Sequence, residues 1–163
     1  MAVNAYMSFT GQKQGVFKGN IKSKGSHAGK SIVFGLSYGV QAPRDIATGM
    51  ASGKRRHQPI TIRKEVDAAS PQLLRALVNN ETLNAKLEIF KAGNGSLKPN
   101  YILELTGGHI NSIKDVAPAA KGSTHSEGRD TYEQEEISFT FQMIDVTWND
   151  GGITMHDDWF APV

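Results

Sequence analysis

Alternation of apolar residues with small or polar ones is the feature that most limits how this chain can fold. In Ser31–Val40, five apolar residues take the even-numbered positions, and Gly35, Ser37 and Gly39 lie between them. A period of two residues is that of a β-strand with one buried side. We therefore predict that the even-numbered residues face a core and that the three small residues face away from it.

Similar patterns and turn signals predict a mainly β chain. Asn-Gly within Ala92–Ser96 and the turn sequence Asn149–Gly152 favour tight hairpins, and therefore antiparallel neighbours. Within Glu136–Trp148 the apolar positions change parity after Met143, which indicates a bulge or a sharp bend. The eight candidate strands are Tyr6–Phe9, Ser31–Val40, Pro59–Lys64, Leu83–Lys91, Asn100–Gly107, His109–Val116, Glu136–Trp148 and Ile153–Phe160.

One short helix is predicted between these strands. Ser70 is a suitable N-cap, and Pro71 suits the first helical position because its missing N–H costs nothing there. The segment then runs to Asn79 or Asn80 and carries one apolar stripe. At about ten residues it falls below the roughly 12 to 15 residues that an isolated helix needs, so it must pack on the sheet. The stripe consists of Leu73, Leu74, Leu77 and Val78.

Two long segments show neither the periodicity of a strand nor that of a helix. Gln41–Gln58 exceeds the roughly 12 to 15 residues of ordinary connections, which favours either a functional loop or a solvated insertion. The same alternatives apply to Ala117–Tyr132. No internal repeat or Pro-rich linker divides the chain, so residues 1–163 are predicted to form a single domain.

Composition excludes several kinds of chemistry. The chain has no cysteine, so thiol catalysis, iron–sulfur ligation and cysteine zinc sites are excluded. The five histidines lie in five different segments without metal-ligand spacing, and His156–Asp158 is more typical of a surface turn or a strand end than of a metal site. Gly25–Ser31 has one residue too few for a phosphate loop and precedes a strand rather than a helix. We predict no catalytic residue, no metal and no cofactor, and hence no enzyme.

Nucleic-acid and membrane binding are also disfavoured. The cluster Lys54–His57 could contact phosphates, but the net charge is only +2 and no aromatic strand adjoins the cluster. A solvated or intersubunit patch is the preferred interpretation. No apolar run approaches the roughly 18 residues of a membrane span, and the N-terminus lacks a secretory signal. We therefore expect synthesis and folding in a cytoplasm.

Charge is distributed unevenly along the chain. Residues 1–64 contain eleven Lys and Arg but only one acid, Asp45, whereas residues 130–163 contain eight acids and no Lys or Arg. Either the two ends of the chain lie together and neutralise each other, or a basic face of one copy meets an acidic face of the next. The second arrangement is heterologous and would produce rings or filaments.

A block of motifs resembles the Hcp family, the haemolysin-coregulated tube proteins of bacterial type VI secretion. The resemblance covers nearly the whole chain in the right order and is most specific between residues 42 and 81. The matching residues are Ala42–Asp45, Ala47–Gly49, Ser52–His57, Pro59–Ile62, Lys64-Glu65, Asp67, Ser70-Pro71, Leu73–Val78, Asn80-Glu81, Trp148, Asp150–Ile153 and Asp157–Trp159.

The resemblance implies a closed antiparallel β-barrel of about eight strands, with one flanking helix and a long extended loop. It implies homohexameric rings that stack into a tube inside a contractile sheath, with a VgrG-like spike protein, sheath proteins and secreted effectors as partners. Such a protein leaves the cytoplasm by type VI secretion without a signal peptide. The alternatives are a phage-tail-tube-like subunit of another contractile injection system and a monomeric barrel that binds a small apolar ligand.

Two groups of residues are predicted to serve assembly. A barrel of this size is filled by its own side chains, so a conduit must form between copies. The residues predicted to line that conduit are Gly35, Ser37, Gly39, Ser138 and Thr140. The residues predicted at subunit interfaces are Arg44, Asp45, Thr48, Gly49, Ser52, Gly53, Lys54, Arg55, Arg56, His57, Asp157 and Asp158.

Overall fold

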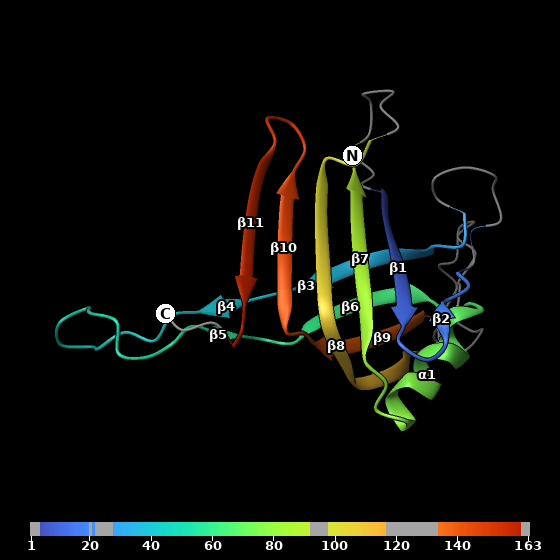
Figure 1. Cartoon of the computed structure of the whole chain (residues 1–163), viewed down its shortest axis with the longest axis horizontal. Helices are drawn as coiled ribbons and strands as arrows, with labels where there is room; N and C mark the ends of the chain where they lie inside the picture. Colours follow the sequence, from blue (N-terminus) through green and yellow to red (C-terminus); the bar gives the residue numbers. More distant parts are fainter. Residues whose placement is uncertain (1–3, 20, 22–27, 92–97, 117–133, 161–163) are drawn as a thin grey trace, which may run out of the picture.

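Six antiparallel strands close into a barrel in the computed structural model, which describes residues 4–19, 21, 28–91, 98–116 and 134–160 (Figure 1). The barrel strands are β1 (Asn4–Gly11), β3 (Ser31–Ser37), β6 (Ile60–Glu65), β7 (Leu83–Phe90), β8 (Tyr101–Val116) and β9 (Gln134–Thr140). They pair in the order β8, β7, β1, β3, β6, β9, and β9 pairs again with β8. The predicted fold class is confirmed, although the closed ring has six strands and the remaining strands extend from it.

A bend in β8 allows the barrel to close. The first half of β8 pairs with β7, and the second half, from His109, pairs with β9. Gly107 lies at the bend with φ +68°, and a Cβ there would lie 3.0 Å from the Cβ of Gln142. The two strands predicted on either side of residue 108 are therefore one continuous strand.

The predicted strand Glu136–Trp148 is two strands rather than one. Strand β9 ends at Thr140, and β10 (Met143–Trp148) then pairs with the first half of β8 outside the closed ring. The change of parity in the sequence thus marks the point where the chain leaves the barrel. Among the described strands, β11 (Ile153–Asp158) pairs with β10 alone, which confirms the hairpin at Asn149–Gly152. The hairpin predicted at Ala92–Ser96 lies outside the described residues.

The helix α1 (Ala69–Val78) covers one end of the barrel (Figure 1). It begins one residue before the predicted cap: Ala68 occupies the N-cap position, and the Ser70 hydroxyl donates to Glu135 Oε1 at 2.6 Å instead. The predicted apolar stripe is wrong for Leu74 and Val78, which are 52% and 75% exposed. Ala69, Leu73 and Ala76 form the buried side. In the described part of the chain, no helix has the length and hydrophobicity of a membrane-spanning helix.

The interior of the barrel is filled by side chains. Met7, Ile60, Leu87, Leu103, Ile137 and Phe139 are each at most 1% exposed. Neighbouring rings, such as those of Phe9 and Phe139, meet edge to face with centroids 6.4 Å apart. A barrel packed in this way holds its shape without a ligand.

Lys64 is a charged residue in this interior, and it is fully buried. Its Nζ donates to Glu135 Oε1 at 2.5 Å and to Asp67 Oδ1 at 2.9 Å. Ser31 donates to the other oxygen of Asp67 at 2.6 Å. These hydrogen bonds join β3, β6, β9 and the start of α1, as a buried charge requires.

The prediction for β3 is partly wrong. Ser31 and Val33 face the core, whereas Phe34 is 49% exposed. The reason is a bulge between Val33 and Gly35, which makes Phe34 an extra residue and shifts the inward-facing positions before it. After the bulge the predicted sides hold, because Leu36 pairs with the buried Ile62, although Leu36 itself is 39% exposed.

Candidate functional site

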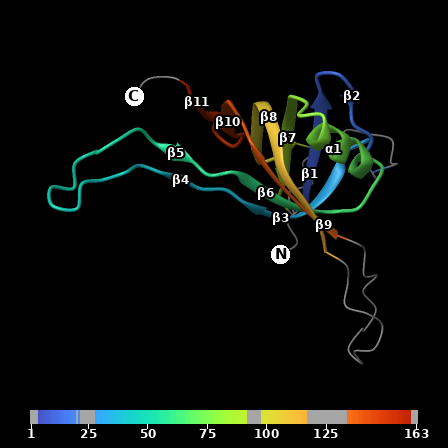
Figure 2. The ribbon, with the colours of Figure 1, turned by 90° about the horizontal axis from the view of Figure 1, so that it is seen from below.

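A hairpin arm formed by residues 38–58 projects from the barrel (Figures 1 and 2). It contains the short strands β4 (Val40–Gln41) and β5 (Arg56–His57), which pair with each other, and a bridge further out between Arg44 and Ala51. The segment Gln41–Gln58, predicted without strand structure, is therefore an ordered antiparallel arm.

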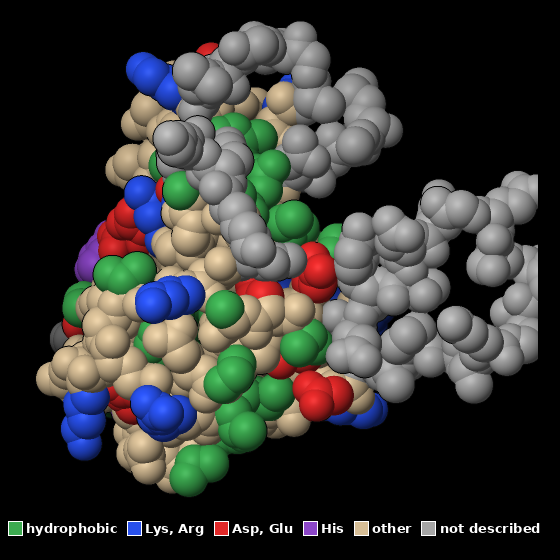
Figure 3. All heavy atoms as spheres, turned by 90° about the vertical axis from the view of Figure 1, so that its right-hand side faces the viewer, with side chains coloured by type: hydrophobic (Ala, Val, Ile, Leu, Met, Phe, Trp, Pro, Cys, Tyr) green, Lys and Arg blue, Asp and Glu red, His purple; other side chains and the backbone are tan. Residues whose placement is uncertain are grey.

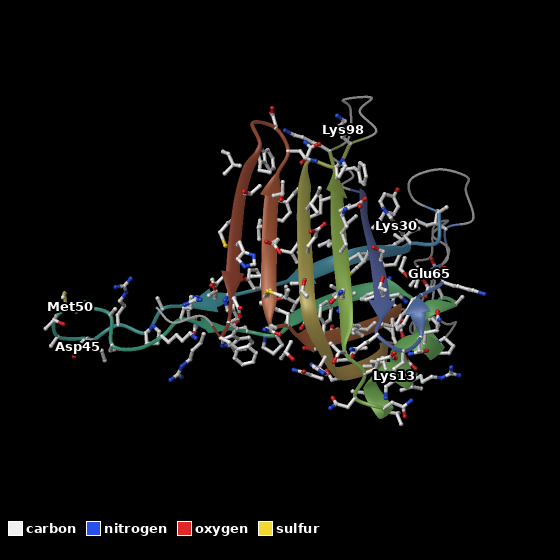
Figure 4. The ribbon with its side chains drawn as sticks, in the orientation of Figure 1. Lys13, Lys30, Asp45, Met50, Glu65 and Lys98 are labelled. Carbon is white, nitrogen blue, oxygen red and sulfur yellow. The ribbon has the colours of Figure 1, made fainter. Side chains whose placement is uncertain are left out.

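The tip of the arm is a hydrogen-bonded turn that displays apolar side chains. Asp45 Oδ1 accepts the N–H groups of Ala47 at 2.8 Å and Thr48 at 2.9 Å, and these bonds lower the pKa of Asp45. Gly49 closes the turn with φ +70°. Ile46 is fully exposed and Met50 is 68% exposed (Figure 4 labels Asp45 and Met50). The turn thus holds two apolar side chains far from the barrel.

At its base the arm is joined to β11 by charged groups. Nε of Arg55 donates to Asp157 Oδ2 at 2.5 Å, and Nη2 binds Oδ1. His57 Nε2 lies 2.6 Å from the same Oδ2. The hydrogen bond from Arg55, together with that from His57, lowers the pKa of Asp157 to about 2. The Asp157 carboxylate therefore stays ionised from neutral pH down to about pH 2.

Aromatic rings surround this ion pair. His57 is buried, and its ring centroid lies 5.2 Å from Phe141 and 5.5 Å from Trp159. Tyr38 Oη lies 3.0 Å from His57 Nδ1, and burial raises the pKa of Tyr38. We call these residues the arm base cluster, and they fix the direction in which the arm leaves the barrel. The cluster consists of Tyr38, Arg55, His57, Phe141, Asp157 and Trp159.

A second surface covers the outside of β3, β6, β9 and the second half of β8. Residues that pair across antiparallel strands share one face of the sheet. Ser37 pairs with Thr61 and Thr61 with Ser138, while Arg63 pairs with Glu136. These side chains point away from the core, and Arg63 lies 3.4 Å from Glu136. We call this surface the outer polar face; it consists of Gly35, Ser37, Thr61, Arg63, Ser112, Lys114, Glu136, Ser138 and Thr140.

The structure bears on the five histidines only in part, because His27 and His125 lie outside the described residues. Among the residues it describes, no three His, Asp or Glu side chains are grouped as ligands for a metal ion. His156 and Asp145 pair on the exposed side of β10 and β11, at 2.6 Å.

Comparison with known proteins identifies the architecture. Residues 6–148 match the family model for the type VI secretion system effector Hcp. The chain is 34% identical to the major exported protein of Pseudomonas aeruginosa, in an alignment that covers 100% of this chain and 99% of that protein. This chain belongs to the Hcp family of type VI secretion.

Solved Hcp structures share its fold. A crystal structure of an Hcp protein superposes with a TM-score of 0.86 at 22% identity, covering 99% of this chain and 100% of that one. The secreted protein Hcp3 from Pseudomonas aeruginosa gives 0.75 at 27% identity, covering 98% and 100%. The expectation of an Hcp-family tube protein of type VI secretion is therefore confirmed.

The predicted interface residues of this Hcp chain separate into two groups. Seven of them, Arg44, Asp45, Thr48, Gly49, Ser52, Gly53 and Arg56, lie exposed along the arm. The others are engaged within the chain. Arg55, His57 and Asp157 belong to the arm base cluster, Lys54 Nζ donates to the carbonyl of Trp159 at 2.5 Å, and the carbonyl of Asp158 accepts from Arg55 at 2.9 Å.

The predicted conduit residues mostly come together in this Hcp chain. Gly35, Ser37, Ser138 and Thr140 all lie on the outer polar face, whereas Gly39 lies at the base of the arm. Of the two interpretations of the charge asymmetry, local neutralisation accounts for the ion pairs of Arg55 with Asp157, Lys64 with Glu135 and Arg63 with Glu136.

Sequence reasoning missed the aromatic half of the arm base cluster. The predicted core side holds for Tyr38 and Phe141, which both pack on the core, but no sequence pattern places their rings beside His57. Trp159 directly follows the acidic pair Asp157-Asp158, and that adjacency of an aromatic ring to paired acids near the C-terminus was the available signal. The predicted loop Ala117–Tyr132 lies outside the described residues.

Proposed function

We propose that this Hcp chain is the ring-forming subunit of the type VI secretion inner tube, with six copies in a ring and rings stacked end to end. The observation that carries the proposal is the filled barrel beside the outer polar face. Because Phe139, Met7 and Leu103 occupy the interior, the hollow of a tube has to lie outside each barrel.

The outer polar face suits the wall of that hollow. Its side chains are small or short in Gly35, Ser37, Thr61, Ser112 and Ser138, so water covers it readily. Its charged members, Arg63, Lys114 and Glu136, carry both signs. A hydrated wall without a strong field or a large apolar patch lets diverse secreted effectors pass or lodge without adhering to it.

The arm suits contacts beyond the ring. It places Ile46 and Met50 at the end of a hairpin whose base is fixed by Arg55 and Asp157. We propose that the arm reaches the adjacent ring, the spike protein or the surrounding sheath. The relative named as the major exported protein supports release of the assembled tube from the cell after synthesis in the cytoplasm.

The monomeric, ligand-binding barrel is less well supported. A barrel that carries an apolar ligand needs an internal cavity, and the interior residues of this one are packed against each other. The phage-tail-tube-like alternative differs only in the machine that drives the tube, and it makes the same demand for rings.

Electron micrographs and native mass spectrometry of the purified chain test the proposal. We expect rings of six copies at tens of micromolar. A second test replaces Arg44 and Arg56, the exposed arm arginines, with Glu and should weaken stacking without unfolding the barrel. A chain that stays monomeric over the whole concentration range would contradict the proposed ring. Tubes of normal length from the arm variant would show that the arm does not take part in stacking.

A further inference from the structure

The buried network around Lys64 holds more acids than cations. Within the described residues of this network, Lys64 supplies one positive charge, whereas Asp67 and Glu135 are both acids with side chains 1% and 3% exposed. A buried charge is costly unless an opposite charge and hydrogen bonds compensate it. The network therefore has one negative charge in excess, at a place that water hardly reaches.

The uncompensated charge belongs to one oxygen of Glu135. An ammonium group has three hydrogens to donate, and Lys64 Nζ directs two of them to Glu135 Oε1 at 2.5 Å and Asp67 Oδ1 at 2.9 Å. The third goes to the carbonyl of Glu65 at 2.8 Å. The Ser70 hydroxyl also donates to Glu135 Oε1, and both oxygens of Asp67 accept hydrogen bonds. Glu135 Oε2 is left, and within the described part of the chain no group donates a hydrogen bond to it.

A hollow of about 390 Å³ adjoins Glu135 beside the start of α1. Ligand sites in proteins typically measure about 300 to 1,000 Å³, so the hollow has room for a small molecule. Figure 3 faces this end of the molecule and shows acidic side chains among hydrophobic ones in its lower half. We call it the acidic hollow: its acidic wall consists of Asp67, Asp115 and Glu135, and its apolar wall includes Val66, Leu74 and Ile113.

Asp115 places a second carboxylate directly opposite Glu135. The two residues pair across β8 and β9, so their side chains share one side of the sheet, with Cβ atoms about 4.5 to 5.5 Å apart. Like charges in directly opposite positions destabilise a sheet. A cation between the two carboxylates would relieve this repulsion and would also donate the hydrogen bond that Glu135 Oε2 lacks.

We propose that the acidic hollow binds a small aliphatic amine, whose ammonium group lies between Glu135 and Asp115 and whose hydrocarbon stem packs on the apolar wall. A metal ion suits the hollow less well, because the described His, Asp and Glu side chains are not grouped as metal ligands and the apolar wall offers a metal nothing. An ammonium group donates to both carboxylates, and the stem buries the apolar side chains. The site does not depend on the proposed ring.

Three probes separate the contribution of the charge from that of the stem. Pentylamine carries both, 1-pentanol carries the stem alone, and ammonium chloride carries the charge alone. In saturation-transfer difference NMR on the full chain, we expect pentylamine to bind about tenfold more tightly than either of the others, because each of them lacks one half of the interaction. Equal affinity for 1-pentanol and pentylamine would show an apolar hollow without a cation site and would overturn the proposal.

Glu135→Gln tests the acid on which the inference depends. The substitution removes the excess charge, while the amide oxygen can still accept from Lys64 and Ser70, so the urea midpoint should stay close to that of the wild type. The affinity for pentylamine should fall about tenfold, to that for 1-pentanol. Glu136→Gln is the matched control, because it removes the same charge from the next residue, which lies on the outer polar face. Equal affinities of these two variants for pentylamine would overturn the proposal.

Asp115→Asn provides a second variant in case Glu135→Gln fails to fold. Asp115 is exposed at the rim of the hollow, so its substitution should leave the fold intact. The affinity for pentylamine should fall severalfold, whereas that for 1-pentanol should not change, because the apolar wall is untouched. Wild-type affinity of Asp115→Asn for pentylamine would contradict an ammonium group held between the two carboxylates.

Discussion

Arg55 on the arm and Asp157 on β11 are 102 positions apart and form an ion pair in which two guanidinium nitrogens bind the two carboxylate oxygens. The pair lies where the arm leaves the barrel, and His57 Nε2 lies 2.6 Å from one of the same oxygens. The direction of the arm thus depends on the C-terminal strand as much as on the arm itself. A subunit whose arm reaches a neighbouring ring needs such a fixed direction, because a freely moving arm would lose more entropy on docking.

Replacing Asp157 with Asn should weaken the attachment of the arm in a pH-dependent way. The pKa of Asp157 is about 2 in the folded chain and 3.8 without its partners, so the ionised carboxylate stabilises the fold above pH 3.8 and this contribution is lost as the pH falls through 2. We expect the urea midpoint of Asp157→Asn to lie below that of the wild type near neutral pH, and the difference to shrink between pH 4 and 2.

Tryptophan fluorescence measures this midpoint, since Trp159 packs against His57. Asp158→Asn is the control, because the hydrogen bond that the described part of the chain donates to the Asp158 side chain comes from Phe160 N, at 2.9 Å, and not from the arm. A difference between wild type and Asp157→Asn that stays constant down to pH 2 would show that the carboxylate does not act through its charge.

Lys64→Met should destabilise the barrel strongly. Removal of the ammonium leaves Glu135 and Asp67 buried without their cation, and breaking a buried pair on one side typically costs about 3 to 5 kcal/mol. Arg63→Met is the matched control, because Arg63 adjoins Lys64 in the sequence and its partner Glu136 adjoins Glu135. The Arg63–Glu136 pair is half-exposed, so we expect its loss to lower the free energy of unfolding by less than about 1 kcal/mol. Equal shifts in chemical denaturation for the two variants would contradict a structural role for the Lys64 network.

The strand pattern of the sequence predicted the fold class because periodicity is a local property. Burial of alternate residues requires no knowledge of which strands pair, and Asn149–Gly152 marks its hairpin by turn chemistry alone. The features of the fold that the pattern did not predict depend on pairing between strands that are distant in the sequence. The bulge after Val33 and the bend at Gly107 let the sheet close, and each changes which side a residue faces.

For the same reason, the contacts within the arm base cluster could not be predicted from local sequence patterns. Arg55 and Asp157 were both singled out from the sequence, but as contacts with another copy, since nothing in their neighbourhoods indicates that β11 passes the root of the arm. The resemblance of residues 42–81 to Hcp proteins identified the family without revealing this pairing. A motif match reports which residues recur, whereas the partner of each depends on the closed topology.

Gly107→Ala tests the bend on which closure depends. An alanine at φ +68° pays about 1 to 2 kcal/mol for the left-handed conformation, and its Cβ would meet the Cβ of Gln142 at 3.0 Å. We expect a lower thermal midpoint. Gly35→Ala is the control, because a Cβ there meets nothing closer than 3.7 Å and no positive φ is involved. Equal midpoints for the two variants would mean that β8 bends without needing glycine.

Ile46→Asp tests whether the arm tip contributes to stacking. Ile46 is fully exposed on a turn that Asp45 and Gly49 organise, so the substitution removes no contact within the chain and should leave the urea midpoint unchanged. If the tip docks against an apolar site on the adjacent ring, a carboxylate there must be desolvated without a partner, and long tubes should give way to single rings. Tube length in negative-stain micrographs and the sedimentation profile measure the outcome. Ala47→Asp adds the same charge one residue away without removing the apolar side chain, and should shorten tubes less. Tubes of wild-type length from Ile46→Asp would show that the arm contacts its neighbours along its sides rather than through its tip.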